Sequence, residues 1–96
     1  MQDERFEWDD AKAATNVRKH KVDFRSAQRV FDDPASFSRA DIRRDYGEKR
    51  FIMTGVVDGR HVTVIYTERA GRFRLISARP SNVVERREYH ERANKD

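Results

Sequence analysis

Residues 66–79 read Tyr-Thr-Glu-Arg-Ala-Gly-Arg-Phe-Arg-Leu-Ile-Ser-Ala-Arg. Two runs with β-branched and aromatic residues flank Ala70-Gly71, and glycine reaches a positive φ at little cost, so this stretch predicts a β-hairpin. Four arginines belong to it: Arg69, Arg72, Arg74 and Arg79. Neighbouring guanidinium groups repel one another and Glu68 is the sole acid among them, so we expect this hairpin to bind an anion, with phosphate the natural candidate.

The composition indicates a single small domain that spans residues 1–96. Hydrophobic residues make up 36% of the chain and charged residues 40%, so we expect a thin core that a partner or self-association helps to stabilise. The chain has 21 Lys and Arg against 17 Asp and Glu, a net charge of +4, so its basic character matters only where cations gather on one surface. The absence of cysteine excludes disulfides, thiol nucleophiles and cysteine zinc sites.

The sequence shows no targeting or membrane segment. No apolar run approaches the roughly 20 residues that span a bilayer. Residues 1–5 carry acids and lead into no apolar stretch of the kind found in signal peptides. We therefore expect a soluble, cytoplasmic protein without a membrane partner.

The first third of the chain predicts two helices. Asp9 is a suitable N-cap for a helix over 10–20, and Asp23 for a second helix whose apolar positions continue to residue 31, before Asp33-Pro34 stops it. The first helix also carries a polar, basic stripe at helical spacing, formed by Lys12, Asn16, Lys19 and His20.

The rest of the chain predicts an antiparallel meander and a final helix. A weak strand signal covers 35–39, and clearer strands cover 50–57, 60–67 and 73–78, the first two joined by the hairpin turn Asp58-Gly59. A helix follows over 82–92, with Val83 and Val84 expected to anchor its first turn. The predicted class is α+β, with two N-terminal helices, a three- to four-stranded antiparallel sheet and a C-terminal helix.

The residue pattern favours chemistry without a metal or cofactor. The acids Asp9, Asp10, Asp32 and Asp33 sit at helix ends, where capping explains them, and the three histidines lack metal-ligand spacing. RNA supplies its own nucleophile, the 2′-hydroxyl, so cleavage needs only orientation, charge stabilisation at the phosphate and proton transfer. A phenol beside guanidinium groups would be more acidic than a free one, which makes a tyrosine one candidate for proton transfer.

Short motifs follow one another in a characteristic order and spacing along nearly the whole chain. They are Phe6-Glu7-Trp8-Asp9, Ala11-Lys12, Asn16, Lys19-His20, Phe24, Ala27, Val30-Phe31, Asp33-Pro34, Gly47-Glu48, Arg50-Phe51, Tyr66-Thr67-Glu68-Arg69, Ile76-Ser77-Ala78-Arg79, Glu85-Arg86 and Tyr89. Through these motifs the chain as a whole resembles the BrnT family of toxins from bacterial toxin-antitoxin pairs.

The resemblance implies a RelE-like fold and a metal-independent ribonuclease that arrests translation. It also implies a cognate BrnA-type antitoxin that neutralises the toxin and binds operator DNA, and it allows a dimer of toxin-antitoxin pairs. One departure concerns the end of the first helix, where the family's Lys-His-Gly is Lys19-His20-Lys21 here. The chain thereby loses the residue best suited to a left-handed C-cap, and the helix is free to end differently.

We expect Arg74 and Arg79 to hold the scissile phosphate, and Glu68 and Tyr89 to transfer protons. The residues expected to support substrate binding are Lys12, His20, Lys49, Arg50 and Ser77. Each has a structural alternative: Glu68 as a turn residue paired with an arginine, Tyr89 as a pin between the last helix and the sheet, the cations as solvent-exposed charges, and Ser77 as a small sheet residue. The alternative function is a module that binds nucleic acid or protein without catalysis.

Overall fold

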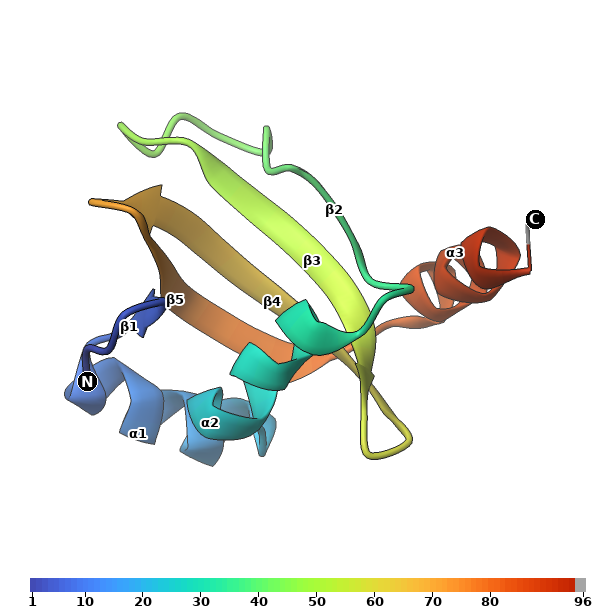
Figure 1. The fold of residues 1–96 in the computed structure, drawn as a ribbon, viewed down its shortest axis with the longest axis horizontal. Coiled ribbons are helices and arrows are strands. Elements are labelled where there is room, and N and C mark those ends of the chain that lie inside the picture. The colour runs from blue at the N-terminus through green and yellow to red at the C-terminus, as the bar shows by residue number, and fades with distance from the viewer. Residues whose placement is uncertain (95–96) are drawn as a thin grey trace.

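The computed structural model describes residues 1–94 (Figure 1). Its elements in chain order are β1 (Phe6–Glu7), α1 (Asp10–His20), α2 (Phe24–Ala27), the 3₁₀ helix η1 (Gln28–Asp32), β2 (Phe37–Ala40), β3 (Arg50–Val57), β4 (Arg60–Arg69), β5 (Arg72–Pro80) and α3 (Val83–Ala93). The predicted α+β class is compatible with this arrangement.

The sheet has five strands in the order β1-β5-β4-β3-β2. The antiparallel meander β3-β4-β5 is confirmed, with positive φ at Asp58, Gly59, Ala70 and Gly71 in its two turns. The four predicted antiparallel strands are present as β2 to β5. The sheet differs from the prediction because β1 adds a fifth strand, which is parallel to β5. A two-residue strand whose partner lies 67 positions along the chain leaves no periodic signal in the sequence.

Helix α1 has the predicted bounds and the predicted N-cap, where the Asp9 side chain accepts from the Lys12 backbone N–H at 2.9 Å. Its end corrects one expectation. Lys21 adopts the left-handed conformation, φ 60° and ψ 30°, and donates its N–H to the Val17 carbonyl. The helix therefore ends in the αL cap that glycine would favour, and the backbone strain falls on a lysine.

The second predicted helix is shorter than expected. Only α2 is α-helical, and the chain tightens into η1 before it ends at Asp32. The predicted apolar stripe is nevertheless buried at Phe24, Ala27 and Val30. Because a 3₁₀ turn needs three residues instead of 3.6, this local tightening is invisible in the hydrophobic spacing.

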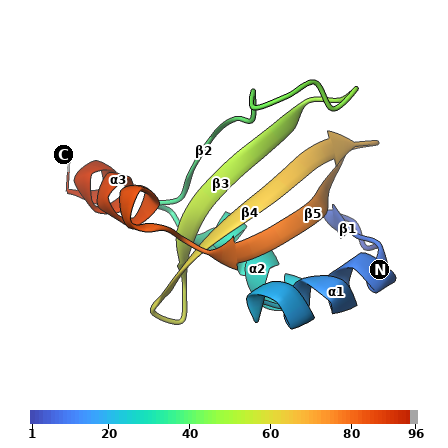
Figure 2. The same cartoon turned by 180° about the vertical axis from the view of Figure 1, so that it is seen from behind.

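Helices α1 and α2 pack on one face of the sheet, as the two opposite views show (Figures 1 and 2). The core between these layers includes Phe6, Trp8, Val22, Phe24, Ala27, Val30, Val57, Val62, Val64, Tyr66, Leu75 and Ala78. The middle of the opposite face carries no helix (Figure 2). We call this second face the open face.

Helix α3 is held by polar contacts more than by apolar ones. Its N-cap Asn82 forms a capping box with Glu85. The expectation that Val83 and Val84 anchor the first turn is wrong, because Val83 is 58% exposed and Val84 is 66% exposed. Glu85 and Tyr89 are the buried residues of this helix, so its attachment depends on their hydrogen bonds.

Candidate functional site

The open face carries a charged row that crosses four strands. Arg50 on β3 pairs in register with Thr67 on β4, Thr67 pairs with Arg74 on β5, and Arg74 pairs with Glu7 on β1. Directly opposed residues project from the same side of a sheet, and Tyr66, the neighbour of Thr67, faces the core. Two strand spacings separate Arg50 from Arg74, so their backbones lie about 10 Å apart.

The row next to it is apolar. Ile52 and Ile65 are register partners, and alternation along the strands places both on the open face. They are only 3% and 7% exposed although no helix lies over them. In register the row continues to Arg39 on β2 and Ser77 on β5, so two buried apolar residues lie between polar ones on this face.

The arginines of this region are paired with acids that come from other elements. Arg74 Nη1 donates to Glu7 Oε2 at 2.7 Å, and Arg50 Nε donates to Glu48 Oε2 at 3.0 Å. The other arginines of the hairpin also have partners: Arg69 with Glu48, Arg72 with the Asp3 carbonyl, and Arg79 with Glu85. The expectation of an uncompensated, self-repelling cluster is therefore wrong, because Glu7, Glu48 and Glu85 supply counter-charges to Arg74, Arg69 and Arg79.

The structure does not bring the Arg74 and Arg79 backbones close together. Their register partners on β4 are Thr67 and Thr63, four residues apart, which corresponds to about 13 Å along a strand. Arg79 also turns toward α3, where it donates to both carboxylate oxygens of Glu85 at 2.7 and 2.8 Å. The phosphate-binding role expected for both residues stays a prediction, and one shared phosphate requires their side chains to reorient.

Three of the expected substrate-binding residues meet in a groove between α1 and β5. This hollow of about 300 Å³ is lined by Lys12, His20 and Ser77, together with Ala11, Thr15, Asn16, Lys19 and Ile76. Asn16 fixes the helix against the strand, because its side chain donates to the Ala78 carbonyl and accepts from the Ala78 N–H. The polar stripe of α1 therefore serves two purposes, with one buried residue that anchors and several exposed cations beside it.

The groove opens close to Arg74. The backbone N–H of Lys12 is the main cause that lowers the pKa of Asp9, and the nearby Arg74 guanidinium adds a smaller effect. The strand register supports this closeness, because Ser77, which lines the groove, pairs with Ile65, and Arg74 pairs with Thr67, two positions further along β4. The charged row and the groove form one basic region, which wraps from the open face around the β5 edge.

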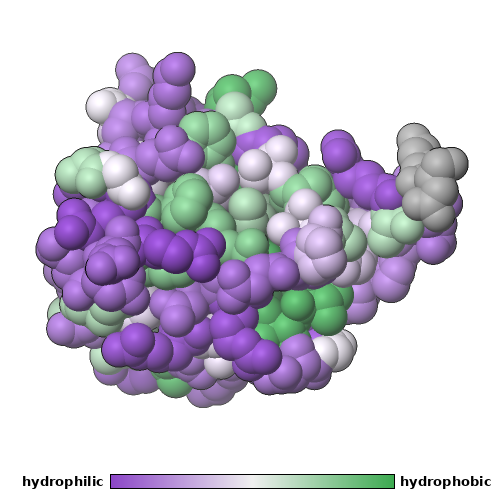
Figure 3. Space-filling model, in the orientation of Figure 1, coloured by the Kyte–Doolittle hydropathy of each residue, from purple (hydrophilic) through white to green (hydrophobic). Residues whose placement is uncertain are grey.

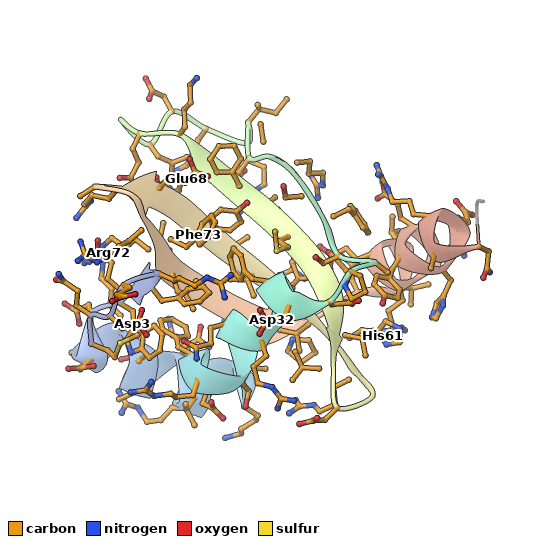
Figure 4. The ribbon with its side chains drawn as sticks, viewed as in Figure 1. Asp3, Asp32, His61, Glu68, Arg72 and Phe73 are labelled. Carbon is orange, nitrogen blue, oxygen red and sulfur yellow. The ribbon has the colours of Figure 1, made fainter. Side chains whose placement is uncertain are left out.

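Glu68 lies outside this region. It is the register partner of Phe73, whose ring packs against the core, so alternation puts Glu68 on the face opposite Arg74. The side chain is exposed at the end of β4, and Figure 4 shows it beside Phe73 on the face that carries α2. Glu68 also lines a hollow at the hairpin turn together with Arg69 and Arg72, and its role in proton transfer stays a prediction.

Tyr89 is buried at the opposite end of the sheet. Its hydroxyl donates to Asp33 Oδ2 at 2.7 Å, and its ring packs edge-on against His61, near the start of β4. Seven residues of β4 separate His61 from Glu68, about 23 Å, so Glu68 and Tyr89 do not form a pair (Figure 4). Burial, with the Asp33 carboxylate, raises the pKa of Tyr89 to about 12, which is opposite to the acidic phenol expected from the sequence.

Lys49 is exposed on the connection between β2 and β3, and its backbone carbonyl accepts the Thr67 hydroxyl at 2.6 Å. Thr67 and Glu7 were not among the expected site residues, although both belong to the charged row. Neither has a local sequence signal, because their importance comes from register with residues on other strands.

The described residues contain no group of three or more histidine, cysteine, aspartate or glutamate side chains arranged to hold a metal ion. Within residues 1–94, no helix has the length and apolar composition needed to cross a membrane. The side chains of the charged row and the groove supply guanidinium, ammonium, imidazole and hydroxyl groups.

Comparison with known proteins identifies the family of the chain. No curated protein matches the chain at a significant level. A family model described as the ribonuclease toxin BrnT of type II toxin-antitoxin systems matches residues 8–85. This range includes α1 and α2 and the entire β3-β4-β5 meander. The chain belongs to the BrnT family of ribonuclease toxins of type II toxin-antitoxin systems.

Proposed function

We propose that this protein is a metal-independent endoribonuclease that inhibits translation by cutting RNA bound along the open face and the groove. The observation that carries the proposal is the row Arg50–Thr67–Arg74, which runs in register across three strands and ends beside the groove. RNA is a polyanion with one phosphate per nucleotide, and arginines on a sheet face match its backbone.

The internal ion pairs leave capacity for a phosphate. Each guanidinium has five N–H donors, whereas the contacts to Glu7 and Glu48 use one donor on Arg74 and one on Arg50. The two arginine side chains are about a quarter exposed, 26% and 25%. The carboxylates thus hold the guanidinium groups in place while other donors remain available to an incoming phosphate.

His20 is the group in the groove best suited to proton transfer, because imidazole both accepts and donates protons. Lys12 supplies charge stabilisation there, and the Ser77 hydroxyl supplies a further hydrogen bond to substrate. Glu68 and Tyr89, the residues expected from the sequence, remain candidates that the same assay tests. Glu68 lies on the opposite face from Arg74, and the Tyr89 hydroxyl is buried and bound to Asp33, so we favour His20 over both.

The proposed reaction is an internal transfer on RNA. The 2′-hydroxyl loses its proton to a base and its oxygen attacks the adjacent phosphorus, while the bond to the 5′-oxygen breaks and that oxygen takes up a proton. The products are a 2′,3′-cyclic phosphate and a 5′-hydroxyl end. Arginine and lysine stabilise the negative charge that develops on the phosphate oxygens.

The test incubates the purified protein with total RNA in excess EDTA and maps the fragment ends. We expect cleavage with cyclic phosphate ends in the wild type, and loss of cleavage in Arg74→Ala. Arg87→Ala is the matched control, since Arg87 is an exposed arginine on α3. A melting curve of each variant separates loss of function from loss of fold.

Three outcomes contradict the proposal. Fragments with 3′-hydroxyl ends exclude attack by the 2′-hydroxyl, and cleavage that stops in EDTA excludes the metal-independent route. RNA that stays intact but bound, with and without added ribosomes, supports the non-catalytic binding module instead.

We further propose that the cognate antitoxin of the BrnA type binds operator DNA, that it neutralises the toxin, and that two toxin-antitoxin pairs form a dimer.

A further inference from the structure

The two edges of the sheet differ in how far other parts of the chain cover them. Beside β1, the N-terminal residues fold back, so that Gln2 bridges Glu7 and Trp8 donates its N–H to the Met1 carbonyl. Beyond β1, the Asn16 side chain covers the β5 backbone. At the other edge lies β2, whose outer side pairs with no strand among residues 1–94.

Strand β2 has the features of a strand that accepts another. Ser38, Arg39 and Ala40 are exposed, and every second residue of an edge strand directs its N–H and C=O groups away from the sheet. The strand contains no proline, which would block this pairing. Main-chain hydrogen bonds would therefore be available to an extended segment laid along it.

A hollow of about 590 Å³ adjoins the end of β2. Its apolar lining is Ala40, Ile42 and Phe51, and its charged lining is Asp41, Arg44, Asp45, Glu48, Lys49 and Arg50. Ile42 is 87% exposed, more than any other large hydrophobic residue within residues 1–94. Figure 3 shows hydrophobic surface at the upper edge of the molecule, where the β2–β3 connection runs.

The charges around the β2 edge indicate which kind of segment would bind there. Arg43 is paired with Asp41, and Arg50 with Glu48. In the part of the chain that the structure describes, no ion pair involves the remaining cations Arg39, Arg44 and Lys49, nor the acid Asp45, which also lines the hollow. Three cations against one acid leave this edge with an excess of positive charge. A second copy that paired β2 with β2 would bring two Arg39 side chains together, which is unfavourable, whereas an acidic segment would neutralise this excess.

We propose that β2 and the adjoining hollow form the docking site for an extended segment of the cognate antitoxin, one that carries acidic side chains and an apolar side chain directed into the hollow. This assignment rests on the proposed function, in which the open face binds RNA. Because Arg50 lines the hollow and also begins the charged row, a segment docked here lies against the RNA surface. Neutralisation then follows from competition with the substrate.

The test measures binding of the full-length cognate antitoxin to the toxin by calorimetry. We expect the double variant Arg39→Glu/Ile42→Asp to weaken binding at least tenfold. The matched control is Arg87→Glu/Val84→Asp on α3, which reverses an exposed arginine and adds a charge at an exposed valine. We expect the control to change the dissociation constant less than twofold, and a melting curve of each variant verifies folding.

A second measurement reads the site directly. Amide hydrogen exchange in the wild type should show protection of residues 38–42 when antitoxin is added. Unchanged affinity of the double variant, or no protection of β2, overturns the proposal. Self-association of the free toxin that the double variant abolishes, with antitoxin binding intact, would assign the edge to a second copy and also overturn it. Both measurements are independent of RNA cleavage, so a failure of the ribonuclease proposal is seen separately.

Discussion

Arg79 donates two hydrogen bonds to the carboxylate of Glu85, at 2.7 and 2.8 Å, and so ties the end of β5 to the first turn of α3. Glu85 is only 5% exposed and also accepts from the Thr63 hydroxyl and from the Asn82 backbone N–H. Burial opposes the charged carboxylate, but Arg79 and the other donors outweigh it and lower the pKa of Glu85. Arg79, which we expect to hold substrate, therefore also stabilises the attachment of α3 to the sheet.

Arg79→Ala should destabilise the protein by about 2 to 3 kcal/mol, because it leaves a buried carboxylate without its counter-charge. The figure lies below that of a fully buried pair because the Arg79 side chain is 28% exposed. Urea unfolding at pH 7 measures the loss. A change below about 0.5 kcal/mol would show that the pair contributes little to stability.

The double variant Arg79→Ala/Glu85→Gln separates structure from substrate binding. Removing the charge of Glu85 relieves the unpaired carboxylate, so we expect part of the lost stability to return. If RNA cleavage returns with it, Arg79 acts only through α3. If cleavage stays absent in the folded double variant, Arg79 contacts the phosphate as expected from the sequence.

Tyr89→Phe should lower the free energy of unfolding by about 1 to 2 kcal/mol at pH 8, because Asp33 loses its hydroxyl donor. The pKa of Tyr89 is raised to about 12 from an ordinary value near 10, so folding favours the neutral phenol. This contribution is complete below pH 10 and is lost as the pH rises from about 10 to 12. The stability difference between wild type and Tyr89→Phe should shrink across that window.

Comparison of the two proteins at each pH cancels the titration of the other tyrosines. A stability difference that stays constant up to pH 12 would contradict the raised pKa. The same variant tests the catalytic role expected from the sequence, since the buried phenol should be dispensable for RNA cleavage. Loss of cleavage in a folded Tyr89→Phe protein would restore Tyr89 as a catalytic residue.

Lys21→Gly should stabilise the protein by about 0.5 to 1 kcal/mol. Lys21 holds φ 60° at the C-cap of α1, a conformation that costs an L-residue about 1 kcal/mol and glycine almost nothing. The greater flexibility of glycine in the unfolded chain offsets part of this gain. The midpoint of urea unfolding measures the effect, with Lys19→Gly, inside the helix, as a control that should be destabilising. A destabilised Lys21→Gly protein would contradict the strain at this cap.

Local signals in the sequence predicted local structure well. The bounds of α1 followed from an aspartate cap and from apolar spacing, and the meander followed from two short turns that contain glycine. Such features depend on residues that are neighbours in the chain. They are therefore readable without knowledge of the fold.

Long-range pairing could not be predicted. Glu7 contacts Arg74 across 67 positions of the sequence, and Asp33 contacts Tyr89 across 56. No local sequence pattern indicates either partner. The sequence therefore overestimated the free positive charge of the hairpin. It also placed Glu68 and Arg74 in one site, because alternation across a hairpin turn decides the face only once the register is known.

His20→Gln should reduce RNA cleavage at least a hundredfold at saturating RNA while leaving the fold intact. The expected size follows from the loss of a proton-transfer group, and glutamine keeps a polar side chain of similar reach. His90→Gln is the matched control, since His90 contacts His61 at the far end of the sheet. Lys12→Ala should mainly weaken RNA binding, and more so at low salt, because an ammonium group contributes attraction to phosphate. Equal loss in both histidine variants would indicate a general structural effect, and full activity of folded His20→Gln would remove the groove from the reaction and return Glu68 to first place among the candidates.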